Sequence, residues 1–388
     1  MSITAPAGFR ASGVTAGLKA SGAPDVALVV NDGPLKHAAA VFTSNRVAAA
    51  PVHWSRRVAA DGRVDAVVLN SGGANACTGP QGFQNTHATA ERAAELLGIS
   101  GTDVAVCSTG LIGEQLPMDK LLAGVGAAAQ ALADDGGAAA AAAIMTTDTV
   151  SKQALFTGTA ADGTGYSIGG MAKGAGMLAP GLATMLVVLT TDAAVGPDGL
   201  DAALRDAVSV SFNRADSDGC MSTNDTVLLL ASGAAGAIPD LAGFTAGLSR
   251  VCSDLARALI GDAEGASHDI AITTINAASE QDAELVGRAV ARSNLFKAAI
   301  FGNDPNWGRV LSAVGTTDAV FDPDALNVSM NGVQICRDGG IGESRDLVDL
   351  TPREVHVEID LRAGDATATI WTNDLTHDYV HENSAYAS

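Results

Sequence analysis

The chain has 388 residues, of which 47% are hydrophobic but only 4% aromatic. That length suffices for one large domain or two to three smaller ones, with alanine, valine, leucine and glycine filling the core. The 23 basic and 43 acidic residues leave a formal net charge of −20, which argues against binding to nucleic acid or to an anionic membrane surface. An acidic substrate would gain no long-range attraction, so nearby lysine or arginine side chains would have to hold it.

The first half of the chain alternates short apolar runs with helical segments. Val26–Val30, Ala66–Leu69 and Val104–Cys107 are predicted as buried strands, because each is rich in β-branched residues and bounded by turn formers. Three helices are expected, at His87–Leu97 with Gly98 as a left-handed stop, from Pro117 to about Ala133, and over the alanine run Ala138–Ala143.

A glycine-rich segment, Gly169–Ala183, then interrupts the pattern. It contains five glycines and one proline, and it favours neither helix nor strand. Thr184–Thr191 follows directly and is predicted as a buried strand. The sequence thus places a hydroxyl residue, Thr184, at the head of a core strand.

The second half repeats the mixed pattern. Beyond Val310 the chain becomes mostly strand-like, because apolar and polar residues alternate from Val355 to Leu361. The order of elements predicts an α+β or α/β protein of layered sheets and helices. The other expected elements are helices at Asp201–Val208, Leu241–Ile260 and Glu280–Lys297, strands at Thr226–Leu230 and Ile270–Ile275, and a polar loop at Phe301–Arg309.

Cysteine usage and the chain ends indicate a cytoplasmic protein. The five cysteines are odd in number and form no CxxC pair, so we expect reduced core thiols. No basic flank precedes an apolar run at the N-terminus, and no apolar stretch has spanning length. The seven histidines show no metal-ligand spacing, and no GxSxG pattern is present, so neither a metal site nor that hydrolase elbow is expected.

Thr184 is the first candidate for chemistry. A threonine hydroxyl is a poor nucleophile unless a base removes its proton. The free α-amine of a chain-starting threonine, with a pKa of about 7.7–8.0, can serve as that base. The Ala183–Thr184 bond would have to break first, and the glycines before it would permit the strained geometry needed. The ordinary alternative is a β-branched residue that starts a strand.

Four other residues each have a functional and an ordinary interpretation. Thr109 and Gly110 follow a buried strand and could stabilise an oxyanion, or could form a plain turn. Lys173 could bind a substrate carboxylate, or could be a solvated lysine. Glu264 could recognise the amino group of an amino acid, or could be an exposed cap at a helix end.

Seven long and unusual segments occur in order along nearly the whole chain. They are Asn70–Gly79, Ser108–Gly113, Met171–Met177, Leu182–Met185, Ser222–Thr226, Gly302–Arg309 and Glu382–Tyr386. Together they resemble the glutamate N-acetyltransferase / ornithine acetyltransferase family of arginine biosynthesis, and no functional motif departs from the family's pattern.

The resemblance implies a fold and a maturation step. The fold would be α+β, a four-layer αββα sandwich similar to N-terminal-nucleophile hydrolases, with smaller α+β subdomains. The precursor would cut itself between Ala183 and Thr184. An α chain of residues 1–183 and a β chain of residues 184–388 would then pair into an (αβ)2 heterotetramer, with an approximate C-terminal α+β subdomain at residues 265–388.

The resemblance also implies a ping-pong acyltransferase that moves acetyl from N-acetylornithine to glutamate through an acetyl-Thr184 ester. No cofactor is expected, and use of acetyl-CoA as a second donor stays open. Two other classes compete with the acyltransferase: a hydrolase of the same architecture and a binding protein without activity. The residue roles implied are Thr184 as nucleophile, Thr109 and Gly110 as oxyanion hole, and Thr146, Lys173, Thr184, Glu264, Asn383 and Ser388 as substrate contacts.

Overall fold

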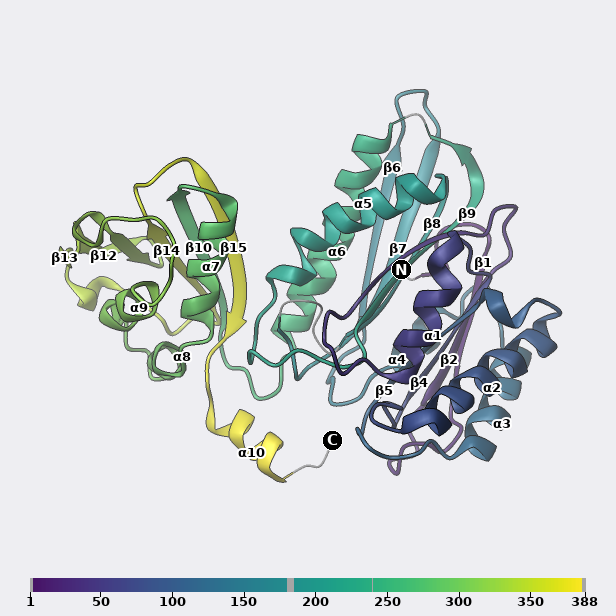
Figure 1. The fold of residues 1–388 in the computed structure, drawn as a ribbon. Coiled ribbons are helices and arrows are strands. Elements are labelled where there is room, and N and C mark those ends of the chain that lie inside the picture. The colour runs from purple at the N-terminus through teal and green to yellow at the C-terminus, as the bar shows by residue number, and fades with distance from the viewer. Residues whose placement is uncertain (1–2, 180–184, 239, 386–388) are drawn as a thin grey trace.

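The computed structural model describes residues 3–179, 185–238 and 240–385 (Figure 1). Within those residues the strands form three sheets. The predicted residues Ala183, Thr184 and Ser388 lie outside the described part of the chain.

Two of the sheets contain the strands expected from the first half of the sequence. In the first sheet, with order β1-β2-β4-β5, β4 and β5 are parallel. In the second, with order β3-β9-β8-β7-β6, β8 and β9 are parallel. The strands are β1 (Phe9–Val14), β2 (Val26–Asn31), β3 (His37–Phe42), β4 (Ala66–Ser71), β5 (Val104–Thr109), β6 (Lys152–Thr159), β7 (Gly165–Lys173), β8 (Leu186–Ala194) and β9 (Thr226–Ala237).

These two sheets pack face to face. Leu69 and Cys107 of the first sheet share one buried cluster with Met171, Val188 and Leu228 of the second. The cluster is built mostly from small and aliphatic side chains, with Phe9 as its buried aromatic member, in keeping with the low aromatic content. Short side chains let the sheets approach closely, so the interface between them is the main core.

Helices cover both outer faces of this pair. On the first sheet lie α2 and α3, which share a second buried cluster with Val68 and Val106. On the second sheet lie α5 and α6, which pack on Leu189 and Leu229. The predicted four-layer αββα sandwich is therefore confirmed. The helices of the sandwich are α1 (Ala50–Val58), α2 (Gly79–Leu97), α3 (Met118–Gln130), α4 (Gly137–Ala143), α5 (Pro197–Ser209) and α6 (Leu241–Gly261).

The third sheet forms a separate body beside the sandwich (Figure 1). Its strand order is β13-β12-β11-β14-β10-β15, and α7 packs on β10 and β15. After the last strand the chain returns below the sandwich as α10 (Figure 1). The elements are β10 (Asp269–Ala277), α7 (Glu280–Ala291), α8 (Asn294–Phe301), α9 (Trp307–Val314), β11 (Asn327–Met330), β12 (Val333–Arg337), β13 (Gly340–Ile341), β14 (Glu354–Asp360), β15 (Ala366–Asn373) and α10 (His377–Ala385).

The prediction that the glycine-rich segment favours neither helix nor strand is confirmed for residues 174–179 but is wrong for its first part. Its first five residues, Gly169–Lys173, belong to strand β7, which pairs on both sides. Gly170 is needed there because a Cβ would lie only 2.8 Å from Leu255 and 3.0 Å from Leu189. Close packing of α6 on the sheet thus explains a glycine that the sequence pattern assigned to a loop.

Two helix boundaries also differ from expectation. Helix α2 begins at Gly79 rather than His87, with a proline in its first turn, where a missing N–H costs nothing. The predicted helix Glu280–Lys297 is two helices, because the side chain of Ser293 accepts a hydrogen bond from the Phe296 N–H and starts α8.

All five cysteines are free thiols, but only three are core residues. Cys107, Cys252 and Cys336 are buried, whereas Cys77 and Cys220 are exposed. Among the described residues, no helix is both long enough and apolar enough to cross a membrane.

Candidate active site

A cavity of about 140 Å³ lies where the carboxyl ends of β5 and β7 meet the segments that follow α4 and α6. It brings together every predicted site residue that the structure describes. Those lining residues are Thr109, Gly110, Thr146, Lys173, Glu264 and Asn383. Residues that lie far apart in sequence therefore form one site.

Lys173 is the most deeply placed of these residues. It is only 1% exposed, so its interpretation as a solvated lysine is wrong. Its Nζ donates a hydrogen bond to Thr109 Oγ1 at 3.0 Å. Lys173 also pairs with Leu186 across the β7–β8 ladder, so it lies beside the start of the strand that the predicted nucleophile precedes.

The Thr109–Gly110 turn has a conformation that requires glycine. Gly110 has φ +128°, and a Cβ would lie 2.5 Å from the Gly73 nitrogen. The carbonyl of Thr109 accepts from the N–H groups of Gly72 and Gly73, at 3.0 and 2.9 Å. The Asn70–Gly79 loop thus packs directly on the predicted oxyanion turn and fixes its backbone.

Asn224 holds the same region together from the other sheet. Its side-chain amide donates to the carbonyl oxygens of Ala74 and Ser108, at 2.6 and 2.8 Å. Ser108 in turn donates to the Asn70 side chain at 2.6 Å. These buried bonds join three of the motifs on which the resemblance depended, and they give a structural reason for the polar residues in them.

Asp225 fixes the first described residue of the predicted β chain. Its Oδ1 accepts from the Met185 N–H at 3.0 Å, and the side chain is fully buried. Burial raises the pKa of this carboxyl well above its usual value, against the smaller effects of the Met185 N–H, Ser222 and Lys173.

A buried charge network that the sequence analysis missed lies beneath the cavity. Asp148 accepts from the N–H groups of Thr146 and Gly174, at 2.9 and 2.7 Å, and pairs with Lys152 at 2.5 Å. Lys152 pairs also with Asp262 at 2.6 Å. Burial alone would raise the pKa of Asp148, but Lys173, Lys152 and the Gly174 N–H hold it below its usual value.

The network also acts on Lys173. Burial lowers the pKa of the Lys173 ammonium, and Asp148 opposes part of that fall. The other charges that act on Lys173 are Lys152, Asp225 and Glu264. Asp148 therefore orients the backbone on both sides of the cavity and helps to keep Lys173 charged.

As the pH is raised, we expect the Asp148→Asn variant to lose activity at a lower pH than the wild type does. Without the carboxylate charge, the pKa of Lys173 falls further, so the ammonium is lost sooner as pH rises. The variant should also unfold more easily, by about 3–5 kcal/mol, because a buried pair is broken. Since the pKa of Asp148 is lowered by folding, this difference should shrink in acid, where the wild-type carboxylate becomes protonated.

Asp262→Asn is the matched control, because it removes the other carboxylate of Lys152 without removing a charge that acts on Lys173. Steady-state rates across pH and urea unfolding measure both effects. Equal pH profiles for Asp148→Asn and the wild type would contradict the assigned role.

The far end of the cavity is acidic. Glu264 Oε2 accepts from the Asn383 side chain at 3.0 Å, and the Glu264 N–H donates to Ala175 at 2.9 Å. Asp218 and Tyr379 line the same end. Burial raises the pKa of Tyr379 to about 12, helped by Asp218, Cys220 and Glu264. The cavity thus has one cationic and one anionic end.

Asp218, Cys220 and Tyr379 were not predicted as site residues. Asp218 lies in a turn, where its oxygens accept from the N–H groups of Met177 and Cys220. Nothing in the spacing of the sequence distinguishes that turn from an ordinary one. The described residues contain no group of three histidine, cysteine or acidic side chains arranged to hold a metal ion.

Fold and site together define the class of protein: a four-layer αββα sandwich with a polar cavity at the carboxyl ends of β5 and β7. A sequence model of the ArgJ family matches residues 10–388. The chain belongs to the ArgJ family, which confirms the resemblance found in the sequence.

A relative known from its sequence matches this chain over its whole length, whereas two solved structures each match about half of it. The arginine biosynthesis bifunctional protein ArgJ of Streptomyces coelicolor is 65% identical and covers 100% of both chains. Among solved structures, ornithine acetyltransferase complexed with ornithine from Mycobacterium tuberculosis is 56% identical, with TM-score 0.45, and covers 48% of this chain and 96% of that one. The bifunctional protein ArgJ from Bacillus halodurans is 32% identical, with TM-score 0.48, and covers 51% and 97%.

Proposed function

We propose that this chain transfers an acetyl group from N-acetylornithine to glutamate in arginine biosynthesis, through an ester on Thr184. The observation that carries the proposal is the cavity with Lys173 and Thr109 at one end and Glu264 and Asn383 at the other. Membership of the ArgJ family supports the reaction class.

The charges of the cavity suit N-acetylornithine. Its α-carboxylate would lie at the buried Lys173 ammonium, and its distal ammonium at Glu264. Glutamate carries an α-carboxylate as well, so Lys173 could hold both substrates in turn. Binding of the two substrates in turn at one cation is what a mechanism with an acetyl-enzyme intermediate requires.

In this mechanism the Ala183–Thr184 bond breaks first and gives Thr184 a free α-amine. The hydroxyl oxygen of Thr184 attacks the acetyl carbonyl while that amine takes the proton. Thr109 and Gly110 stabilise the tetrahedral oxyanion. The carbon–nitrogen bond to ornithine breaks, and ornithine leaves with the proton. The amine of glutamate then attacks the ester carbonyl, its proton passes through the Thr184 α-amine to the threonine oxygen, and the carbon–oxygen bond breaks to release N-acetylglutamate.

Three finer points belong to the same proposal. Cleavage gives an α chain of residues 1–183 and a β chain of 184–388, which assemble as an (αβ)2 heterotetramer. Acetyl-CoA acts as a second acetyl donor, as the word bifunctional in the names of the relatives suggests. The enzyme is cytoplasmic, which fits five cysteines that are all free thiols.

The proposal is tested by mass spectrometry of purified enzyme that has been incubated with N-acetylornithine and then quenched. We expect two chains that divide before Thr184, with one acetyl group on the peptide that begins at Thr184. Glutamate added before the quench should remove that acetyl group as N-acetylglutamate. Release of acetate at the same rate without glutamate would show a hydrolase instead, and active enzyme made only of uncut chain would refute the mechanism.

A further inference from the structure

Helix α10 contributes residues to the cavity but buries little apolar surface of its own. Tyr379 is its one partly buried side chain among His377–Ser384, and the others are exposed. Val380, its aliphatic residue in that stretch, is 55% exposed. Yet α10 supplies Tyr379 and Asn383 to the lining of the cavity. The rings of His377 and Phe301 meet edge-on with their centroids 5.5 Å apart, and hydrogen bonds at the start of the helix supply further contacts that position it.

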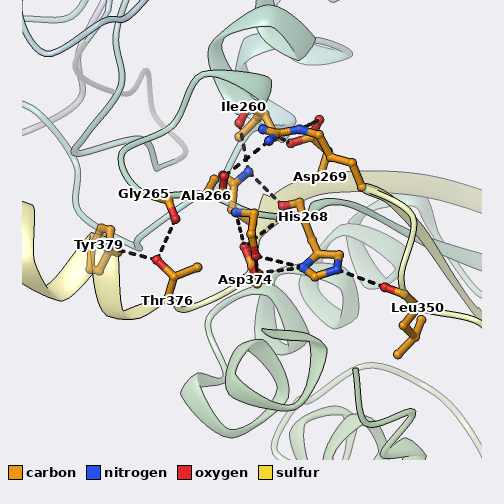
Figure 2. A network of polar contacts seen from close by, with 12 residues as sticks. Ile260, Gly265, Ala266, His268, Asp269, Leu350, Asp374, Thr376 and Tyr379 are labelled. Atoms are coloured by element: carbon orange, nitrogen blue, oxygen red, sulfur yellow. Dashed lines mark hydrogen bonds and ion pairs between the residues drawn. The ribbon is translucent and has the colours of Figure 1, made fainter. Parts of the chain in front are cut away.

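A tight contact connects the start of α10 to the turn after Glu264. The hydroxyl of Thr376 donates to the Gly265 carbonyl at 2.6 Å and accepts from the Tyr379 N–H at 3.0 Å (Figure 2). Gly265 has φ +62°, and a Cβ there would lie 2.2 Å from the Tyr379 nitrogen. The turn and the first residues of the helix are therefore in direct backbone contact.

A second contact is made by the buried carboxylate of Asp374, two residues before Thr376. The side chain of Asp374 is fully buried and accepts from the N–H groups of Ser267 and His268, both at 3.0 Å. It also accepts from the Ser267 hydroxyl and lies 2.8 Å from His268 Nδ1 (Figure 2). One side chain thus joins the end of β15 to the loop that follows Glu264.

His268 completes this arrangement. Its Nε2 lies 3.0 Å from the carbonyl of Leu350, which can only accept. Its Nδ1 faces a carboxylate that already accepts three other hydrogen bonds. The ring therefore lies between two oxygen acceptors, the Asp374 carboxylate and the Leu350 carbonyl, and connects the end of β15 to the segment before β14.

We propose that Asp374, His268 and Thr376 act as positioning residues: they fix α10 against the Glu264 turn, so that Asn383 holds Glu264 at the acidic end of the cavity. The hydrogen bond from Asn383 to Glu264 Oε2, at 3.0 Å, is the step that reaches the site. The kinetic part rests on the proposed function, whereas the positioning of α10 is independent of it.

The variants Asp374→Asn and Thr376→Val test the proposal. Asp374→Asn keeps an acceptor for the backbone but removes the charge, and Thr376→Val keeps shape but removes the hydroxyl. Thr369→Val is the matched control, because Thr369 lies within β15 and, in the described part of the chain, its hydroxyl bonds with that of Thr273 on the same sheet. Hydrogen exchange of residues 377–385 and the kinetics with N-acetylornithine are measured for each.

We expect faster exchange across α10 and a rise in KM for N-acetylornithine of roughly tenfold, with little change in kcat, because a hydrogen bond to a charged group is lost. Combined with Asn383→Ala, the effects on KM should not add. The control should match the wild type in both measurements. If Asp374→Asn does not fold, Thr376→Val decides.

Unchanged exchange in α10 would overturn the proposal, and so would faster exchange with an unchanged KM. Full additivity with Asn383→Ala would also overturn it, because the two changes would then act separately. Should the wild type fail to transfer acetyl, the exchange experiment still tests how α10 is held.

Discussion

Alanine in place of Thr184 is expected to leave a single uncut chain without acetyl transfer. The variant lacks the hydroxyl that attacks the preceding carbonyl, so the Ala183–Thr184 bond persists. Without cleavage, neither the nucleophile nor its α-amine base is present, and the loss should reach at least about 10⁴-fold in kcat. Denaturing electrophoresis and a coupled assay for ornithine release measure the two effects.

Thr184→Ser is the control for this experiment, because serine keeps the hydroxyl while losing only a methyl group. We expect it to cleave, more slowly, and to retain measurable transfer. The described surroundings should be unaffected in both variants, since Met185 and Asp225 keep their hydrogen bond. Acetyl transfer by the uncut Thr184→Ala protein would refute the role of Thr184.

The strands of the sandwich were predictable because they are apolar, short and bounded by turn residues, whereas the four-layer arrangement was an expectation from the family resemblance. Val26–Val30, Ala66–Leu69 and Val104–Cys107 are such runs, and all three lie in one sheet. Strand β7 escaped prediction because its glycines follow from a neighbour: Gly170 makes room for Leu255 of α6. When packing against another element requires a particular residue type, the neighbouring sequence contains no pattern that predicts it.

The residues of the site likewise fall into those that were predicted from the sequence and those that were not. Thr109 and Lys173 were found because they lie within unusual motifs, and Glu264 because it follows a predicted helix. The ordinary interpretation of Lys173 could be rejected only with its burial known. Asp148 and Asp374 were missed altogether. Each acts through backbone N–H groups of another segment, Asp148 through Gly174 and Asp374 through Ser267 and His268. Such partners cannot be read from spacing along the chain.

The charge of Lys173 sets the second large prediction. An isolated ammonium is costly to bury. Among the described residues it has one hydrogen bond, to Thr109, and the nearby Asp148 charge. Within that part of the chain Asp148 forms its ion pair with Lys152 and not with Lys173. A buried cation that is left partly unpaired stabilises the fold poorly but can bind an anion strongly.

We therefore expect Lys173→Met to lower kcat/KM for N-acetylornithine by about 10²–10³-fold, the cost of leaving a buried carboxylate without its cation. Methionine fills similar volume, and Asp148 keeps Lys152, so the melting temperature should stay level or rise. Lys120→Met, at an exposed lysine that bonds only to the Gly17 carbonyl, is the matched control and should keep full activity. A stable Lys173→Met enzyme with wild-type kcat/KM would show that the substrate carboxylate binds elsewhere, whereas an unfolded one would show that the buried ammonium supports the fold after all.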